Sequence, residues 1–238
     1  FFNTNFLQLQ TTYVDAINGD DTTARPGTIK AYRSVGAAIS NAPNDSSIYI
    51  KGTNYVYSWL FPSNKISAIN IYNRTNLTIY GDNEVSTIDG SGQFGGSVFW
   101  ISNCSGLTFK DLVIRGYTNH NWLALPDAGG GAPGFGYNWA CIDIYKSAHI
   151  TFRNCAIIDC VDQGIQDASV YSGLMAGGGI TNIPSTNNIL ITGCRFYNIG
   201  NYRSNISFGA IVQLDGTAIV PTGWTIENCY FDFCLRGI

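Results

Sequence analysis

The apolar and polar residues of this chain recur in an eight-residue phrase. Its four full copies are Leu107–Ile114, Ile150–Ile157, Ile189–Phe196 and Trp224–Phe231, and a weaker copy begins at Leu77. The first, third, sixth and eighth residues are apolar or Cys, whereas the second and fourth are mostly polar. Such alternation is typical of strands with one buried face. The fifth residue is Asp, Asn or Gly, which tolerate the left-handed backbone of a sharp bend. The phrase therefore predicts two short strands joined by a bend.

A third short strand is predicted before each full copy. These segments are Val98–Ser102, Cys141–Tyr145, Gly179–Ile183 and Ala210–Leu214. One repeat of three strands cannot bury its apolar face alone, but stacked repeats can, with neighbouring strands ~4.8 Å apart. The repeats differ in length, so the extra residues must form loops. We therefore predict an all-β fold, a single-stranded right-handed parallel β-helix in which each coil stacks on the previous one.

The N-terminal part of the chain has a different pattern. A strand running into a turn is predicted over Tyr13–Thr22, and Ser47–Gly52 reads as the first coil strand. The apolar spacing over Thr28–Ala42 is that of a short amphipathic helix, which would cover the open end of the stack. We assign residues 1–46 to this strand, turn and capping helix, and residues 47–238 to coils that we expect to continue beyond residue 238.

Composition narrows the classes of partner. Charged residues are 12% of the chain, and its net charge is −3 with thirteen scattered basic residues, so no nucleic-acid-binding patch is predicted. No apolar run approaches the ~18 residues that cross a bilayer. Seven cysteines cannot all pair internally, and neither they nor the two histidines form a metal-binding pattern. Cys155, Cys194 and Cys229 share one inward position, which indicates reduced core thiols. A disulfide between neighbouring coils is the alternative.

The outward residues of the third strand predict a ligand-binding surface. If Ile101, Ile144 and Ile183 point inward, the residue before each of them points outward. The external column then contains Trp100, Asp143, Asn182 and Gln213. Trp offers a flat face to a sugar ring, and the carboxyl and amides offer hydrogen bonds to hydroxyls. The alternative is a solvated polar face with one exposed Trp.

Two long insertions, about 118–140 and 162–178, should flank this column. The first is rich in glycine and carries Trp122, Tyr137 and Trp139, which we expect to stack on sugars or to contact another subunit. Packing of the loop on the solenoid is the alternative.

Candidate catalytic groups lie beside the same column. Glycosidases use two carboxyl groups, ~5–5.5 Å or ~6.5–9.5 Å apart. The best pair that the sequence offers is Asp143 with Asp162 or Asp167. Asp162 and Asp167 also fit loop turns, in which they would hydrogen-bond their own backbone.

Residues 13–55 resemble the N-terminal cap of the pectin-lyase-like right-handed β-helix superfamily. The shared pattern is a strand, a Gly-Asp-Asp turn, a capping helix, and an Ile-Tyr-Ile strand that ends near Gly and Tyr. The later coils fit the same superfamily, so the resemblance spans nearly the whole chain. Asp20–Arg25 resembles, in particular, bacteriophage tailspike and tail-fibre β-helix domains. The resemblance is specific for the fold, because the superfamily includes lyases, hydrolases, epimerases and non-catalytic adhesins.

The resemblance implies an extracellular or virion-surface protein that binds a polysaccharide and forms a homotrimer or another homo-oligomer. Lyases of the superfamily use a Lys or Arg base, often with Ca²⁺ held by several carboxylates. Lys146 and Arg153 could reach the groove rim, but no cluster of three or four acids accompanies them, so no metal or other cofactor is predicted.

Three functional hypotheses follow. The leading one is a tailspike-like or fibre-like adhesin that binds a host surface polysaccharide, with cleavage of that polysaccharide left open. The second is a secreted polysaccharide lyase or glycoside hydrolase. The third is a non-catalytic structural component of a filament or spike.

Overall fold

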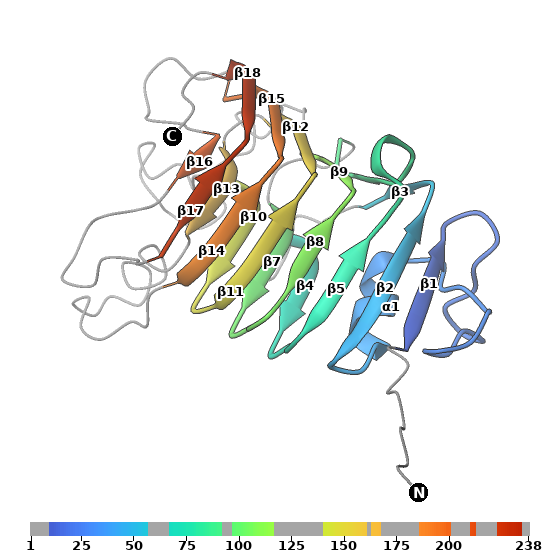
Figure 1. Ribbon diagram of the computed structural model, residues 1–238. Coiled ribbons are helices and arrows are strands. Elements are labelled where there is room, and N and C mark those ends of the chain that lie inside the picture. The colour runs from blue at the N-terminus through green and yellow to red at the C-terminus, as the bar shows by residue number, and fades with distance from the viewer. Residues whose placement is uncertain are drawn as a thin grey trace, which may run out of the picture.

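The computed structural model describes residues 10–56, 67–91, 97–116, 140–160, 163–167, 186–200, 210–212 and 223–234. Within these ranges the chain is mostly β-strand, with one α-helix, α1 (Val35–Asn41), and one short 3₁₀ helix, η1 (Asn83–Val85). The strands pair in parallel and form three sheets, which we name A, B and C (Figure 1).

Each sheet collects strands from along the whole chain. Sheet A contains β1 (Thr11–Asp15), β2 (Ser46–Lys51), β5 (Leu77–Tyr80), β8 (Thr108–Lys110), β11 (Ala148–Arg153), β14 (Asn187–Thr192) and β17 (Thr225–Glu227). Sheet B contains β3 (Thr53–Tyr55), β6 (Thr87–Asp89), β9 (Val113–Arg115), β12 (Ala156–Cys160), β15 (Arg195–Ile199) and β18 (Tyr230–Cys234). Sheet C contains β4 (Ser67–Tyr72), β7 (Ser97–Ser102), β10 (Ala140–Tyr145), β13 (Gln163–Asp167) and β16 (Ile211–Val212).

The order of these strands is cyclic. From β4 onward the chain visits sheets C, A and B in turn, and each strand pairs with its counterpart in the circuit before it. One circuit therefore lies on the next, and Figure 1 shows the sheet A strands side by side in chain order. This arrangement buries one face of every sheet.

The recurring phrase forms the strand pairs of sheets A and B, as predicted. Its two halves are the strand pairs β8–β9, β11–β12, β14–β15 and β17–β18. The fifth residues are Asp111, Asn154, Gly193 and Asn228, and all four have positive φ. Asn154 donates from Nδ2 to Asp111 Oδ1 at 3.3 Å. A Cβ at Gly193 would lie 2.5 Å from Asn154 Oδ1, so a larger residue there would require the Asn154 side chain to shift.

Inward side chains stack from coil to coil. The rings of Phe109 and Phe152 are stacked with centroids 5.0 Å apart. Cys155 and Cys194 are buried in the same core, and Cys229 is partly buried against it. All seven cysteines are free thiols, in agreement with the prediction of reduced core cysteines.

The α-helix is shorter than the apolar spacing predicts. The backbone of Tyr32 is held by β1, because its N–H donates to Tyr13 O and its carbonyl accepts from Asp15 N. Helical geometry can therefore begin only after Tyr32. Ser34 is the N-cap and its hydroxyl accepts from Ala37 N.

The helix packs on the N-terminal end of the stack. Val35, Ala38 and Ile39 are its buried residues, and α1 contacts β1, β2 and β4. In Figure 1 it lies behind β1 and β2. Because β1 pairs with β2 throughout its length, the N-terminal segment also supplies the first strand of sheet A.

One strand of sheet C differs from the prediction. Gly179–Ile183 is expected beside β10, but that place is taken by β13. The sequence of β13, Gln-Gly-Ile-Gln-Asp, has one large apolar residue, Ile165, and therefore lacks the alternation that marks the other strands. Residues 179–183 lie outside the described ranges.

Neither helix in the described ranges combines the length and hydrophobicity that a bilayer-crossing helix requires.

Candidate functional site

The outer face of sheet C carries a row of four described side chains. Strand register aligns Asn70, Trp100, Asp143 and Gln166 on consecutive strands, and we name these four the Asp143 row. The residues on either side of Asp143 along β10 are buried core isoleucines, so the row points away from the core. The predicted neighbourhood of Trp100 and Asp143 is therefore present, whereas Gln166 occupies the place expected for Asn182.

Asp143 is a buried carboxyl on this outer face, with 2% of its surface exposed. Ser97 Oγ donates a hydrogen bond to its Oδ2, and the backbone N–H of Ala140 bonds to the same carboxyl. Burial raises the pKa of Asp143 to about 8, although both hydrogen bonds act in the opposite direction. The carboxyl is therefore mostly protonated at neutral pH and can donate a proton.

Aromatic side chains lie beside the Asp143 row. Tyr145 is two residues beyond Asp143, and its ring lies 6.0 Å from the ring of Trp100 at 36°. Lys146 Nζ lies 4.8 Å from the centroid of the Tyr145 ring. Tyr72 donates from its hydroxyl to Asn70 Oδ1 at 3.0 Å. Trp100 is only half-buried, so this end of the face offers aromatic surface with hydrogen-bonding groups around it.

Gln166 was not predicted from the sequence. Its side chain is fully buried, and among the described residues neither its Oε1 nor its Nε2 has a hydrogen-bond partner. Buried amide groups without partners are rare, because each one costs about 1–3 kcal/mol. The feature that identifies Gln166 is its unpaired amide beside Asp143. The sequence does not reveal this feature, because it depends on the register between β13 and β10.

The other predicted site residues are distributed as follows. Asp167 is buried on β13, but its Cα pairs with Ile144 rather than Asp143, so strand alternation places it outside the Asp143 row. Arg153 belongs to sheet A, where it pairs with Lys110 and Thr192 and lies away from sheet C. The predicted residues that fall outside the described ranges are Asp162, Asn182, Gln213, Trp122, Tyr137 and Trp139. The row position expected for Gln213 belongs to Val212.

Among the described residues, no group of three or more His, Cys, Asp or Glu side chains is arranged to hold a metal ion.

Comparison with known proteins bears on the fold. The sequence matches no protein-family model and no curated protein sequence. The structure is similar to a chain described as rhamnogalacturonan lyase, with a TM-score of 0.58 and 16% identity. The two chains share a fold. The match covers 93% of this chain and 51% of the other, so this chain spans about half the length of that lyase chain.

A second similar structure is a candidate glycosyl hydrolase from Parabacteroides merdae, with a TM-score of 0.43 and 10% identity over 80% of this chain and 74% of the other. The rhamnogalacturonan lyase chain is not described as a phage protein, so the resemblance to tailspikes gains no support from it.

Proposed function

We propose that this chain is an extracellular carbohydrate-acting protein that binds a polysaccharide on the outer face of sheet C and uses Asp143 to cleave it. The observation that carries the proposal is the protonated, buried Asp143 carboxyl beside the half-buried ring of Trp100. Proteins place carboxyls with raised pKa values where a proton must be donated near neutral pH. The shared fold with a rhamnogalacturonan lyase agrees with a carbohydrate substrate.

The reaction that fits this carboxyl is glycoside hydrolysis. Asp143 would donate its proton to the glycosidic oxygen as the bond to the anomeric carbon breaks. Water would then add to that carbon and pass its proton to a second carboxylate, for which Asp162 is the remaining candidate because Asp167 lies outside the Asp143 row. β-Elimination instead begins with removal of a proton by a base, and a carboxyl that is protonated at neutral pH is unsuited to that step.

The proposal includes a fold of the single-stranded right-handed parallel β-helix type. Cyclic passage through three parallel sheets supports it, and connections between parallel strands of one sheet are right-handed in about 98% of cases. We assign α1 as the cap of the N-terminal end because its apolar face covers β1, β2 and β4 there.

The test is incubation with a panel of acidic and neutral polysaccharides, with new reducing ends and unsaturated uronates as readouts. Cleavage that is lost in Asp143→Asn and weakened in Trp100→Ala is the expected result. Tyr13→Ala is the matched control, because Tyr13 is an exposed aromatic residue on sheet A. Unsaturated products would show that the reaction is elimination and not hydrolysis. Cleavage that survives in Asp143→Asn would contradict the role assigned to Asp143.

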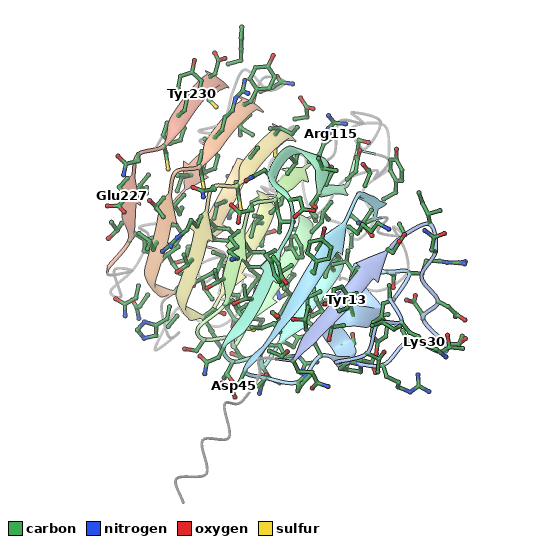
Figure 2. All side chains as sticks on the ribbon, turned by 45° about the vertical axis from the view of Figure 1, so that its right-hand side comes forward. Tyr13, Lys30, Asp45, Arg115, Glu227 and Tyr230 are labelled. Atoms are coloured by element: carbon green, nitrogen blue, oxygen red, sulfur yellow. The ribbon has the colours of Figure 1, made fainter. Side chains whose placement is uncertain are left out.

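A second candidate is a non-cleaving adhesin of the tailspike or fibre type, assembled as a homotrimer. Exposed Tyr230 and Phe233 on β18 favour contact with another chain, and Tyr230 lies at the opposite end of the molecule from Tyr13 (Figure 2). Binding without cleavage would favour this candidate. Light scattering of the wild type and of Tyr230→Lys would then show whether an oligomer forms through this end.

A further inference from the structure

The Asp143 row becomes progressively more enclosed along the stack. Asn70 and Trp100 are half-buried, Asp143 is 2% exposed and Gln166 is fully buried. All five residues of β13 are buried, so its outward side is covered as well as its inward side. A groove that crossed the whole sheet would leave outward residues accessible on every strand. The row instead has an open end at Asn70 and Trp100 and a closed end at Gln166.

The closed end holds a donor and an acceptor without partners. Gln166 Nε2 can donate and Gln166 Oε1 can accept, and neither has a hydrogen-bond partner in the part of the chain that the structure describes. Two neighbouring hydroxyls of one sugar ring satisfy both, since one accepts from Nε2 while the other donates to Oε1. Asp143, the next residue of the row, would then lie beside the linkage of that same sugar unit.

We propose that the site takes the end of a glycan chain, with an uncharged terminal sugar held at Gln166 through two neighbouring hydroxyls and the rest of the chain leaving over Trp100. This inference rests on the proposed function, because it assumes that the outer face of sheet C binds a glycan. It adds that binding is terminal rather than internal, and it makes Gln166 the residue that determines specificity.

The enclosed part of the row suits an uncharged sugar. Gln166 carries no charge, and Asp143 is mostly protonated at neutral pH. Lys146, the cation of the described part of this face, lies over the Tyr145 ring beyond the end of β10. A uronate at Gln166 would place a carboxylate in a buried position with no cation of the described residues beside it, which is strongly unfavourable.

The experiment measures binding of soluble oligosaccharides to the whole chain by calorimetry. The panel contains matched neutral and uronate-terminated oligosaccharides, and the best neutral binder is also prepared with one further sugar at either end. Terminal binding predicts that extension at one end lowers affinity at least tenfold and that extension at the other end has little effect. Replacing the terminal sugar by its uronate should lower affinity by a similar factor.

Gln166→Met removes both hydrogen-bonding groups and keeps the length of the side chain. We expect it to weaken binding of the neutral oligosaccharide about 10- to 100-fold, because each hydroxyl loses its partner. It should not lower the unfolding midpoint, because the amide that it removes has no partner among the described residues. If Gln166→Met binds more weakly and its unfolding midpoint is unchanged, the loss of affinity is therefore due to lost contacts with the ligand and not to misfolding.

Two outcomes separate this inference from the proposed function. In the first outcome, the wild type binds and Trp100→Ala weakens binding, so the glycan-binding face stands. If extension at both ends is then tolerated, or if Gln166→Met binds as well as the wild type, the terminal mode of binding is wrong. If the wild type binds no member of the panel, then the glycan-binding face itself is wrong.

Discussion

Arg74 should be one of the most important surface residues for stability, because it holds the end of α1. Its Nη1 donates to Ala42 O at 3.1 Å, and its Nη2 donates to Ile39 O at 2.7 Å and to Ser40 O at 2.6 Å. The last carbonyls of a helix have no partner within the helix and carry partial negative charge. One guanidinium therefore satisfies three of them and joins α1 to the turn that follows β4.

The magnitude follows from these contacts. A hydrogen bond to a charged group contributes about 1.5–3 kcal/mol, and bonds to one side chain are not additive. Since Arg74 is half-exposed, we expect Arg74→Ala to lower the free energy of unfolding by about 2–4 kcal/mol. For a domain of this size the midpoint of thermal unfolding should fall by roughly 5–15 °C. Arg74→Lys keeps the charge without the fork of donors and should lose roughly half as much.

The assay is urea and thermal unfolding of both variants, followed by circular dichroism. Arg153→Ala is the matched control, because Arg153 is exposed on sheet A and should change stability by less than about 0.5 kcal/mol. Hydrogen exchange should also show faster exchange at Ala42 N–H, which bonds to Ala38 O at the end of α1. A seven-residue helix is not stable in isolation. An Arg74→Ala variant as stable as Arg153→Ala would refute this account of how α1 is held.

Three further predictions concern ionisable groups. Because the folded-state pKa of Asp143 lies above its unfolded value, its protonated form stabilises the fold at low pH. The free energy of unfolding should fall by up to about 1.4 kcal/mol per pH unit as pH rises from ~5 to ~8. Asp143→Asn should flatten this pH-dependence, measured as the midpoint of urea unfolding. The ammonium of Lys51 holds the pKa of Asp15 below its usual range, so this contribution should be complete above pH ~4 and should shrink as pH falls further, and Asp15→Asn should reduce stability clearly more at pH 7 than at pH 2. Ellman's reagent should react with Cys229 and Cys234, which are only partly buried, before the five buried thiols, and with all seven after unfolding; equal rates for all seven would contradict the stacked core.

The sequence predicts those parts of the fold in which the strands themselves show apolar–polar alternation and a bend residue. The phrase pairs alternating residues with Asp111, Asn154, Gly193 or Asn228 at the bend, and both features appear in the structure. These positions are predictable because the periodicity and the left-handed bend are properties of the local sequence.

The parts that were predicted wrongly depend on distant contacts. The start of α1 is set by the pairing of Tyr32 with β1, which overrides the apolar spacing before Ser34. The strand β13 has one large apolar residue, and its position is set by pairing with β10 and β16. Gln166 is consequently invisible to pattern analysis, although Trp100 and Asp143 are correctly placed on neighbouring strands by the strand before each phrase.

The other strongly buried acids with cationic partners show why Asp143 is unusual in this fold. Asp15 pairs with Lys51 at 2.9 Å, and Asp89 pairs with Arg115, labelled in Figure 2, at 3.3 Å. A cation beside a buried carboxylate offsets part of the cost of removing its charge from water. Asp143 has a serine hydroxyl and a backbone N–H as its partners instead, and its pKa is raised rather than lowered. Under the proposed function, this protonated carboxyl would donate its proton to the glycosidic oxygen of the sugar unit held beside it at Gln166.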